Sequence, residues 1–492
     1  MLQEQSSLLS LSTELVLLIL GLSSNPTLIA IAKTCRRLHY LALPIYLARY
    51  GIASSPAPRS FALRDKALRA LPGLSAAVFI TSADDLWCKF QGPEEFYFQR
   101  GVRDLHAFVH GLSSVSRVSL DVGNIDTRWI DGLATAVSDA WKPTFIRMLD
   151  AALERGCTSL TVAHGHFLVA SSFERPQVVP ERTFLGLSFP PRRKRLSSAR
   201  VLPGNTLASF NIHSNMLLAQ PFYDWTLRTL HANPITSLSL RVPGLAQDTW
   251  PLVLGAITLP SLASFSAESL DIAFPTLLLF LRRHPTISAL TLHPHFPYPR
   301  AGAGALPKRR KNHRSNTLLP RLAALGGSTA NVAALLGHLR ADTALRVREV
   351  TLVLPMHQRV FRAADYDALT ALVVGVVRGT SARPRALALR FSVPCETLRC
   401  ARRAPEDGAC EVRALLGSVE SVRFGTDGRY MFARWVMPRL PAWLGAHFVR
   451  LRNVVLSEEC VEGVDVCRRE MVVRAIKEAC PGVKNVLFAH ES

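Results

Sequence analysis

The chain has 492 residues, a formal net charge of +21 at pH 7 and a hydrophobic content of 48%. This hydrophobic content, with only 19% charged residues, excludes a disordered chain, and the length predicts several domains or one extended repeat array. The longest apolar runs, residues 15–22 and 273–281, are shorter than the roughly 18 residues that a membrane-spanning helix needs, so we expect no membrane association.

The first apolar segment, residues 11–20 (LSTELVLLIL), is either the core of a secretory signal peptide or the first helix of a folded domain. The first thirty residues contain no Lys or Arg, and Glu14 is negative where a signal peptide needs positive charge. A helix capped by Ser12 or Thr13 would place apolar side chains on one face, at Leu15, Leu18, Ile19 and Leu22. We therefore predict a helix. With nine cysteines in no secreted framework, we expect an intracellular protein, cytoplasmic or nuclear.

The next segments predict a turn and a second helix. Residues 21–26 (GLSSNP) indicate the turn, and residues 27–43 the helix, which we expect to break at Pro44 before residues 45–52. The second apolar stripe comprises Leu28, Ile31, Ala32, Cys35 and Leu38. Two short helices with stripes this wide cannot bury them against each other alone, so we expect a partner to cover the remaining apolar surface.

The residues of these two segments resemble an F-box, whose pattern begins Leu-Pro-x-Glu-Leu and ends in Cys-Arg-x-aromatic or Cys-Arg-x-Leu. The matching residues are Leu11, Glu14-Leu15, Ile19-Leu20, Leu28 and Thr34-Cys35-Arg36-Arg37-Leu38. The chain departs from the pattern at Ser12, where the family has Pro, and at Leu38, where many members have Trp. The other interpretation is a plain amphipathic hairpin that packs on its own protein.

A short pattern, apolar-x-x-apolar-x-apolar, recurs through the rest of the chain. Its copies are residues 115–120, 157–162, 207–212, 235–240, 287–292, 347–352, 419–424, 451–456 and 483–488, with weaker ones at 262–267, 319–324 and 384–389. The alternation at the end of each copy predicts a strand. Helical stretches separate many of the copies, at residues 144–156, 275–284, 329–340, 366–379 and 469–480.

The spacing of these strand–helix units predicts an α/β fold. Units 25 to 28 residues apart in the middle and 32 apart at the end indicate an irregular, leucine-rich-repeat-like solenoid with parallel strands. A doubly wound parallel sheet is the alternative, but so many strands without a Gly-rich phosphate loop favour the solenoid. We predict an F-box-like helical domain at residues 8–52, a linker or capping region at 53–110 and the solenoid at 111–492. This layout resembles F-box proteins of basidiomycete fungi.

The positive charge includes two compact clusters, residues 192–195 (RRKR) and 308–314 (KRRKNHR). Each has the size of a nuclear import signal, although a solvated loop has the same composition. The remaining cations are scattered and lack interleaved aromatic residues, so we do not expect nucleic acid as a partner. A basic nuclear protein associated with nucleic acid nevertheless stays an alternative function.

The sequence contains little that indicates catalysis. Residues 326–328 (GGS) precede an expected helix and suggest an anion site, which an ordinary helix cap also explains. The histidine pairs His164/His166 and His293/His295 have no acidic or cysteine partner nearby in sequence, and the C-terminal cysteines have no zinc spacing. We expect no enzyme, no cofactor and no metal.

The F-box resemblance implies a substrate-recognition subunit of a cullin–RING (SCF-type) ubiquitin ligase, which binds a Skp-type adaptor and, through it, a cullin. The residues that would contact the adaptor are Leu11, Glu14, Leu15, Ile19, Leu28, Cys35, Arg36 and Leu38. The exposed positions of the strands would bind a protein target, acidic or phosphorylated, through Arg117, Asp121, Asn211, His213, Arg241, His293, Arg390 and Arg423. A repeat scaffold that recruits no ligase is a further alternative.

Overall fold

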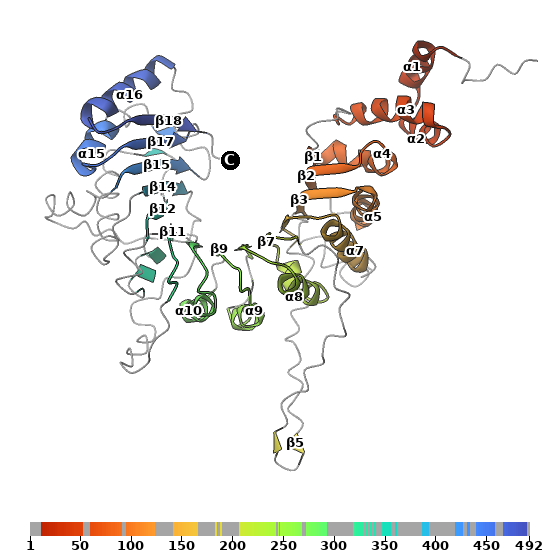
Figure 1. The fold of residues 1–492 in the computed structure, drawn as a ribbon. Helices are drawn as coiled ribbons and strands as arrows, with labels where there is room; N and C mark the ends of the chain where they lie inside the picture. The colour runs from red at the N-terminus through yellow and green to blue at the C-terminus, as the bar shows by residue number, and fades with distance from the viewer. Residues whose placement is uncertain are drawn as a thin grey trace, which may run out of the picture. The chain divides into compact units, whose positions relative to one another are not determined.

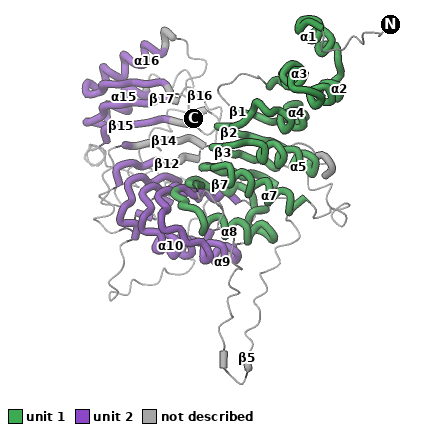
Figure 2. Tube along the Cα trace, turned by 45° about the vertical axis from the view of Figure 1, so that its right-hand side comes forward, with its two compact units in different colours: residues 1–236 green, residues 237–492 purple. Residues whose placement is uncertain are grey.

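The computed structural model describes a mixed α/β protein whose main-sheet strands run parallel (Figure 1). It divides into two compact units, residues 1–236 and 237–492 (Figure 2). The described residues are 11–52, 60–90, 95–123, 141–165, 183–184, 187–188, 206–242, 245, 247–267, 272–292, 318–328, 331–332, 335–336, 339, 347–355, 360–361, 386–392, 419–426, 431–432, 439–457 and 466–489.

The first unit begins with three helices, α1 (Thr13–Leu22), α2 (Asn25–Ala32) and α3 (Arg36–Arg49). The single helix predicted over residues 27–43, with its break at Pro44, is wrong. The chain breaks at residues 33–35 instead, and Pro44 lies inside α3, where packing against α2 offsets the loss of one helical hydrogen bond. Pro26, expected in a turn, begins α2, because the first helical turn needs no amide from it.

The α/β part of unit 1 continues from these helices. Its parallel strands follow chain order, as β1 (Ser60–Leu63), β2 (Ser82–Lys89), β3 (Ser114–Asp121), β4 (Ser159–Ala163) and β7 (Ser209–His213). Its helices lie along one side of them in Figure 1, as α4 (Leu71–Ala76), α5 (Glu95–Gly111), α7 (Trp141–Glu154) and α8 (Phe222–Ala232). Two 3₁₀ turns (Asp65–Ala70 and Asn215–Leu218) and a short antiparallel pair, β5 (Thr183–Phe184) with β6 (Leu187–Ser188), complete the described elements.

Unit 2 repeats this arrangement. Its parallel strands are β8 (Ser237–Leu240), β9 (Ser264–Ala267), β10 (Ala289–Leu292), β11 (Ala324–Ser328), β12 (Glu349–Pro355), β14 (Ala386–Ser392), β15 (Ser421–Thr426), β17 (Asn453–Ser457) and β18 (Asn485–Ala489). Its helices are α9 (Trp250–Ala256), α10 (Phe274–Arg283), α15 (Arg439–His447) and α16 (Val466–Ala479). A separate parallel pair joins β13 (Val360–Phe361) to β16 (Met431–Phe432).

The strand order distinguishes the two α/β architectures that the sequence allowed. Among the described strands of each unit, every strand of the main sheet lies next to its neighbours in chain order. A doubly wound sheet requires a point where this order reverses, so the alternative is wrong for these strands. The strand–helix arrangement begins at Ser60 rather than at residue 111, because β1 and β2 pair in register with β3.

The core lies between the strands and their helices. Along each strand, buried side chains alternate with partly exposed ones, and one buried position repeats from strand to strand. Its occupants are at most 1% exposed: Val118, Leu160, Phe210, Leu238, Phe265 and Leu290. Burying each such side chain contributes about 1.5–3 kcal/mol, so this repeated position is a main source of stability.

Residues 326–328 form the end of β11, and the described helical residues 331–332 and 335–336 follow them, in the stretch where a helix is expected. Gly327 adopts a φ of 148°, and a Cβ atom there would meet the carbonyl group of Leu292 on the neighbouring strand. Glycine at this position is therefore needed for close strand packing.

His284, at the end of α10, is a buried histidine held by two hydrogen bonds in unit 2. Its Nδ1 lies 2.8 Å from the carbonyl oxygen of Phe280, and its Nε2 accepts from the amide of Leu259 at 3.0 Å. Because Nε2 accepts, the ring is neutral and Nδ1 carries the proton. Burial accordingly lowers the pKa of His284 below its ordinary value of 6.5.

We expect the stability of unit 2 to fall in acid because of His284. The unfolded chain binds the proton more readily than the folded one, so the stabilisation is complete above pH 6.5 and is lost as the pH falls toward the lowered pKa. The loss amounts to about 1.4 kcal/mol for each unit of difference between the two pKa values. Urea unfolding at several pH values measures it. His284→Gln should be less stable at pH 8 but lose less on acidification, and equal pH dependence in both proteins would contradict the assignment.

Candidate interaction surfaces

Two arginines of α3 hold α1 at its ends. At the first end, Nη2 of Arg37 donates to the carbonyl oxygen of Leu11 at 3.0 Å and to Oγ1 of Thr13 at 3.2 Å. Arg49 donates at the other end to the carbonyl oxygens of Gly21 (2.7 Å) and Ser23 (2.7 Å) and to Oδ1 of Asn25 (2.8 Å). The carbonyl groups that end α1 lack helical partners, so Arg49 satisfies them and fixes the direction of the helix.

α1 buries one narrow side and exposes a wide apolar one. Val16 and Leu20 are 1% and 0% exposed. Five large apolar side chains of α1 are exposed, among them Leu17 (39%), and we call the four that share one side of the helix the α1 apolar face: Leu15 (50% exposed), Leu18 (64%), Ile19 (41%) and Leu22 (85%). These are the four positions that the sequence placed on one helix face. Soluble monomers rarely leave a contiguous apolar patch uncovered, so this face is a candidate binding surface.

Two polar residues are expected to contact the same partner as this surface, Glu14 on α1 and Arg36 on α3. Glu14 is fully exposed, and its own backbone amide and the hydroxyl of Ser12 donate to the carboxylate and hold its pKa below the ordinary value. Arg36, at the start of α3, is also exposed, while Leu11 and Cys35 are half-buried.

Leu28 and Leu38 do not belong to the exposed face on which the sequence analysis placed them. Leu28 on α2 and Leu38 on α3 are 0% and 6% exposed. The break at residues 33–35 folds α2 against α3. The apolar stripe, expected on the exposed side of a single helix, therefore lies in the contact between these two helices. Both leucines therefore stabilise the N-terminal helices from within.

The N-terminal helices are fixed to the first strand–helix repeat through α3. The hydroxyl of Tyr46 donates to the carbonyl oxygen of Arg69 at 2.8 Å, and its ring, 2% exposed, lies against Gly73 of α4. Nε2 of His39 accepts from the amide of Val78 at 3.3 Å. α1 is thus carried on a helix that is itself anchored to the α/β part.

The exposed face of the unit 1 strands carries paired charges. Arg117 lies 3.4 Å from Asp85 on the neighbouring strand, and Lys89 lies 3.9 Å from Asp121. Asn211, also expected to bind a target, donates through Nδ2 to Oγ1 of Thr161 at 2.9 Å. The predicted alternation places these residues outward, but neighbouring strands already provide partners for them.

Asp121 is the most connected of these residues. Its Oδ1 accepts from the amide of Gly123 at 2.9 Å and lies 2.7 Å from Nδ1 of His164, whose backbone φ is +62°. The strand register pairs Asp121 with Ala163 and Ala163 with His213, which brings these positions to one end of the strands. From the sequence alone, His164 is expected to be an ordinary loop residue. It directly follows β4, and β4 pairs with β3, the strand that ends at Asp121.

The residues expected to bind a target in unit 2 are only partly described. Arg241 follows β8 and Arg423 lies in β15, and both are exposed. Arg390 lies in β14, where its backbone pairs with Gly425 and Val353. His293 lies outside the described residues, as do the basic clusters at 192–195 and 308–314. Within the described part of the chain, His, Cys, Asp and Glu residues form no group of three that could hold a metal ion.

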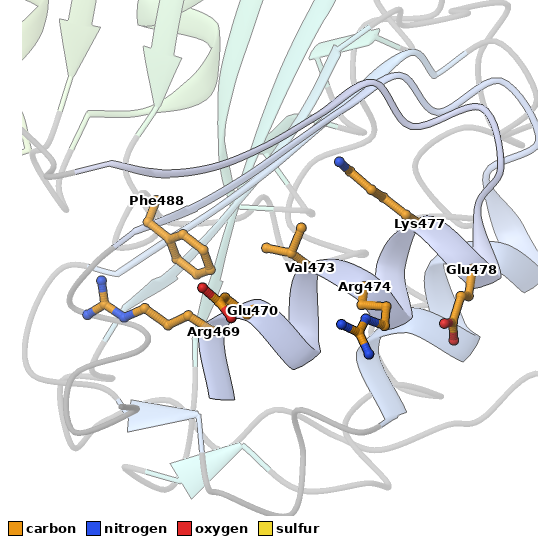
Figure 3. Close-up of a pocket in the computed structure, with 7 residues that line it drawn as sticks. All are labelled: Arg469, Glu470, Val473, Arg474, Lys477, Glu478 and Phe488. Carbon is orange, nitrogen blue, oxygen red and sulfur yellow. The ribbon is translucent and has the colours of Figure 1, made fainter. Parts of the chain in front are cut away.

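A hollow of about 580 Å³ lies between α16 and Phe488 of β18 (Figure 3). Its helix side consists of six residues that we call the α16 face: Arg469, Glu470, Val473, Arg474, Lys477 and Glu478. The guanidinium group of Arg469 lies 5.3 Å from the centre of the Phe488 ring, a cation–π contact that holds both side chains. The sequence predicts no binding surface at the α16 face, although the charged residues there recur at helical spacing.

The chain matches no family model, and comparison with curated proteins finds no significant match. Among the described residues, no helix is both long and apolar enough to span a membrane.

Proposed function

We propose that this protein is the substrate-recognition subunit of a cullin–RING (SCF-type) ubiquitin ligase. The observation that carries the proposal is the α1 apolar face, four large apolar side chains exposed on one short helix. A surface of this kind favours a protein partner. The resemblance of residues 8–52 to an F-box favours a Skp-type adaptor as that partner, which would connect the chain to a cullin.

The way α1 is held supports this function. Arg37 and Arg49 fix the helix on α3, and Tyr46 fixes α3 on the first repeat. A preformed helix loses little conformational freedom on binding, so its contacts contribute more fully to affinity. In the mechanism, the chain supplies no catalytic group. It holds a target close to a ubiquitin-charged enzyme that is bound elsewhere in the ligase.

The strand–helix repeats are the proposed target-binding part, a leucine-rich-repeat-like solenoid. Parallel strands in chain order, each with one buried and one partly exposed side, support this architecture. The exposed cations Arg241 and Arg423 suit an acidic or phosphorylated protein segment, because Arg can bind such groups through two hydrogen bonds.

The α1 apolar face also weighs against a repeat scaffold that recruits no ligase. In such a scaffold the N-terminal helices would bury their own apolar side chains, whereas Leu18 and Leu22 are 64% and 85% exposed. A nucleic-acid partner is less favoured on the unit 1 strand face, because Arg117 and Lys89 there already lie beside carboxylates.

Co-purification of the full chain with a Skp-type adaptor and cullin tests the proposal. We expect a stoichiometric complex that persists in moderate salt, because an apolar contact is little screened. An adaptor that does not bind the purified chain would contradict the ligase function. Strong, salt-dependent binding to nucleic acid in place of the adaptor would favour the alternative.

Reversing the charge of Arg241, Arg390 and Arg423 to Glu should abolish capture of an acidic or phosphorylated target. The substitutions should leave adaptor binding unchanged, because none of these residues belongs to the α1 apolar face. Adaptor-dependent ubiquitination of captured proteins, quantified by mass spectrometry, measures the effect. Reversal of Arg282 on α10, an exposed arginine of the same unit, is the matched control. Undiminished capture by the triple variant would place the target site elsewhere.

A further inference from the structure

We infer that the α16 face and the side of β18 on which no described strand pairs form an interface with a second copy of this chain. β18 is the last strand in the order of the described strands of unit 2, and β17 pairs with one of its sides. Strands at the edge of a sheet readily pair with another chain. The hollow beside α16 is lined by Phe488 of this same strand (Figure 3).

The charge pattern of the α16 face identifies a second copy as the occupant. In an antiparallel pair of identical helices, a two-fold axis between residues 473 and 474 places residues opposite each other when their numbers sum to 947. Glu470 then faces Lys477 of the other copy, and Arg469 faces Glu478. Both pairs have opposite charges, and symmetry forms each of them twice. The surface is therefore complementary to itself.

The residues at the axis fit the same geometry. Val473 is half-buried and would face the aliphatic part of Arg474 from the other copy. The charge of Arg474 is compensated within its own helix, because Glu470 and Glu478 each lie four residues away. Arg469 can keep its contact with Phe488 while its charge faces Glu478. In this arrangement every charged residue of the α16 face lies near a residue of opposite charge, in its own helix or in the other copy.

The same axis also suits the sheet. A two-fold axis that makes the two α16 helices antiparallel makes the two β18 strands antiparallel as well, which is the arrangement in which edge strands pair across a symmetric dimer. Leu487 on β18 is 55% exposed, and Val486 and Phe488 are only half-buried. A second copy would cover these apolar side chains and continue the sheet.

Light scattering during size-exclusion chromatography of the full chain tests the inference. We expect the mass to approach twice 54.1 kDa as the protein concentration rises through the micromolar range. Reversing one charge, Lys477→Glu or Glu470→Lys, turns two attractive pairs into two repulsive ones and should weaken the dimer by about 10-fold or more. The double variant, E470K with K477E, restores opposite charges and should return the affinity to near that of the unmodified chain.

The matched control is Arg282→Glu, a charge reversal of the same size on α10 that should leave the mass unchanged. A chain that stays monomeric at every concentration would overturn the inference. Association that persists in both single variants would also overturn it, because a dimer held by another surface, such as the α1 apolar face, would not respond to these charges. Circular dichroism identifies any variant that fails to fold, and Lys477→Ala then replaces it, with the same direction of effect expected.

Discussion

Replacing Leu15 and Leu18 together by alanine is expected to weaken binding of a Skp-type adaptor by about three orders of magnitude. These side chains are 50% and 64% exposed on the α1 apolar face, so a partner that covers them gains most of their burial. Central apolar anchors of an interface contribute about 2 kcal/mol each, and 1.4 kcal/mol corresponds to about 10-fold in affinity. Isothermal titration of the full chain with purified adaptor measures the loss.

The control for this experiment is the same substitution elsewhere on the protein. Leu252 on α9 and Leu279 on α10 are 54% and 60% exposed, which matches the α1 leucines in residue type and exposure. Their replacement by alanine should leave adaptor binding unchanged. Alanine is a good helix former, so α1 itself should persist in the double variant. Full affinity after loss of both α1 leucines would contradict the F-box proposal.

The sequence predicted α1 well because its local signals agree. The periodic leucines lie on one face, and Ser12 stands at the N-cap position, although its side chain makes no capping hydrogen bond to the helix. The prediction of one helix over residues 27–43 is wrong because it places the break at Pro44, whereas the chain breaks at residues 33–35. A proline within a helix loses one hydrogen bond, and the packing of α2 on α3 outweighs that loss. Whether Leu28 faces inward or outward depends on this tertiary contact, so periodicity alone could not decide it.

The strands of the repeats were predictable where apolar alternation is clear, as in β3, β4 and β7. β1 has only four residues, too few for the pattern to indicate that the repeats begin there. β11 ends in Gly326, Gly327 and Ser328, a composition that suggests a loop. Gly327 is explained by the close approach of the Leu292 backbone, and a Cβ atom at Gly326 would meet the side chains of Thr291 and Thr351, neither of which the sequence reveals.

Side-chain pairing across strands could not be predicted. The contact between Asp121 and His164 joins residues 43 positions apart and depends on the register of β3 with β4 and on the positive φ of His164. The sequence identified Asp121 as outward-facing but gave no partner. The same is true of Arg117 and Asp85, whose pairing alters the surface expected to bind a target. Register has to be known before the free and the paired charges of such a face can be distinguished.

The junction between the N-terminal helices and the first repeat depends on Tyr46, and Tyr46→Ala is expected to lower the free energy of unfolding of unit 1 by about 3–5 kcal/mol. The ring is 2% exposed, so its removal leaves a cavity, and the hydrogen bond to the carbonyl oxygen of Arg69 is lost with it. Chemical denaturation followed by circular dichroism measures the change. Tyr40→Ala on the same helix, with a ring that is 42% exposed, should cost far less and is the matched control.

A double-mutant cycle with Gly73 tests whether the Tyr46 ring itself forms this junction. A methyl group added at Gly73 would meet the ring directly, so Gly73→Ala should destabilise unit 1 by about 1–3 kcal/mol. In a Tyr46→Leu background the smaller side chain leaves room for the methyl group, and the same substitution should cost much less. Additive effects of the two substitutions would show that the ring does not contact α4. Coupling between them would establish that α1 is carried by a rigid attachment, which its role as a preformed binding helix requires.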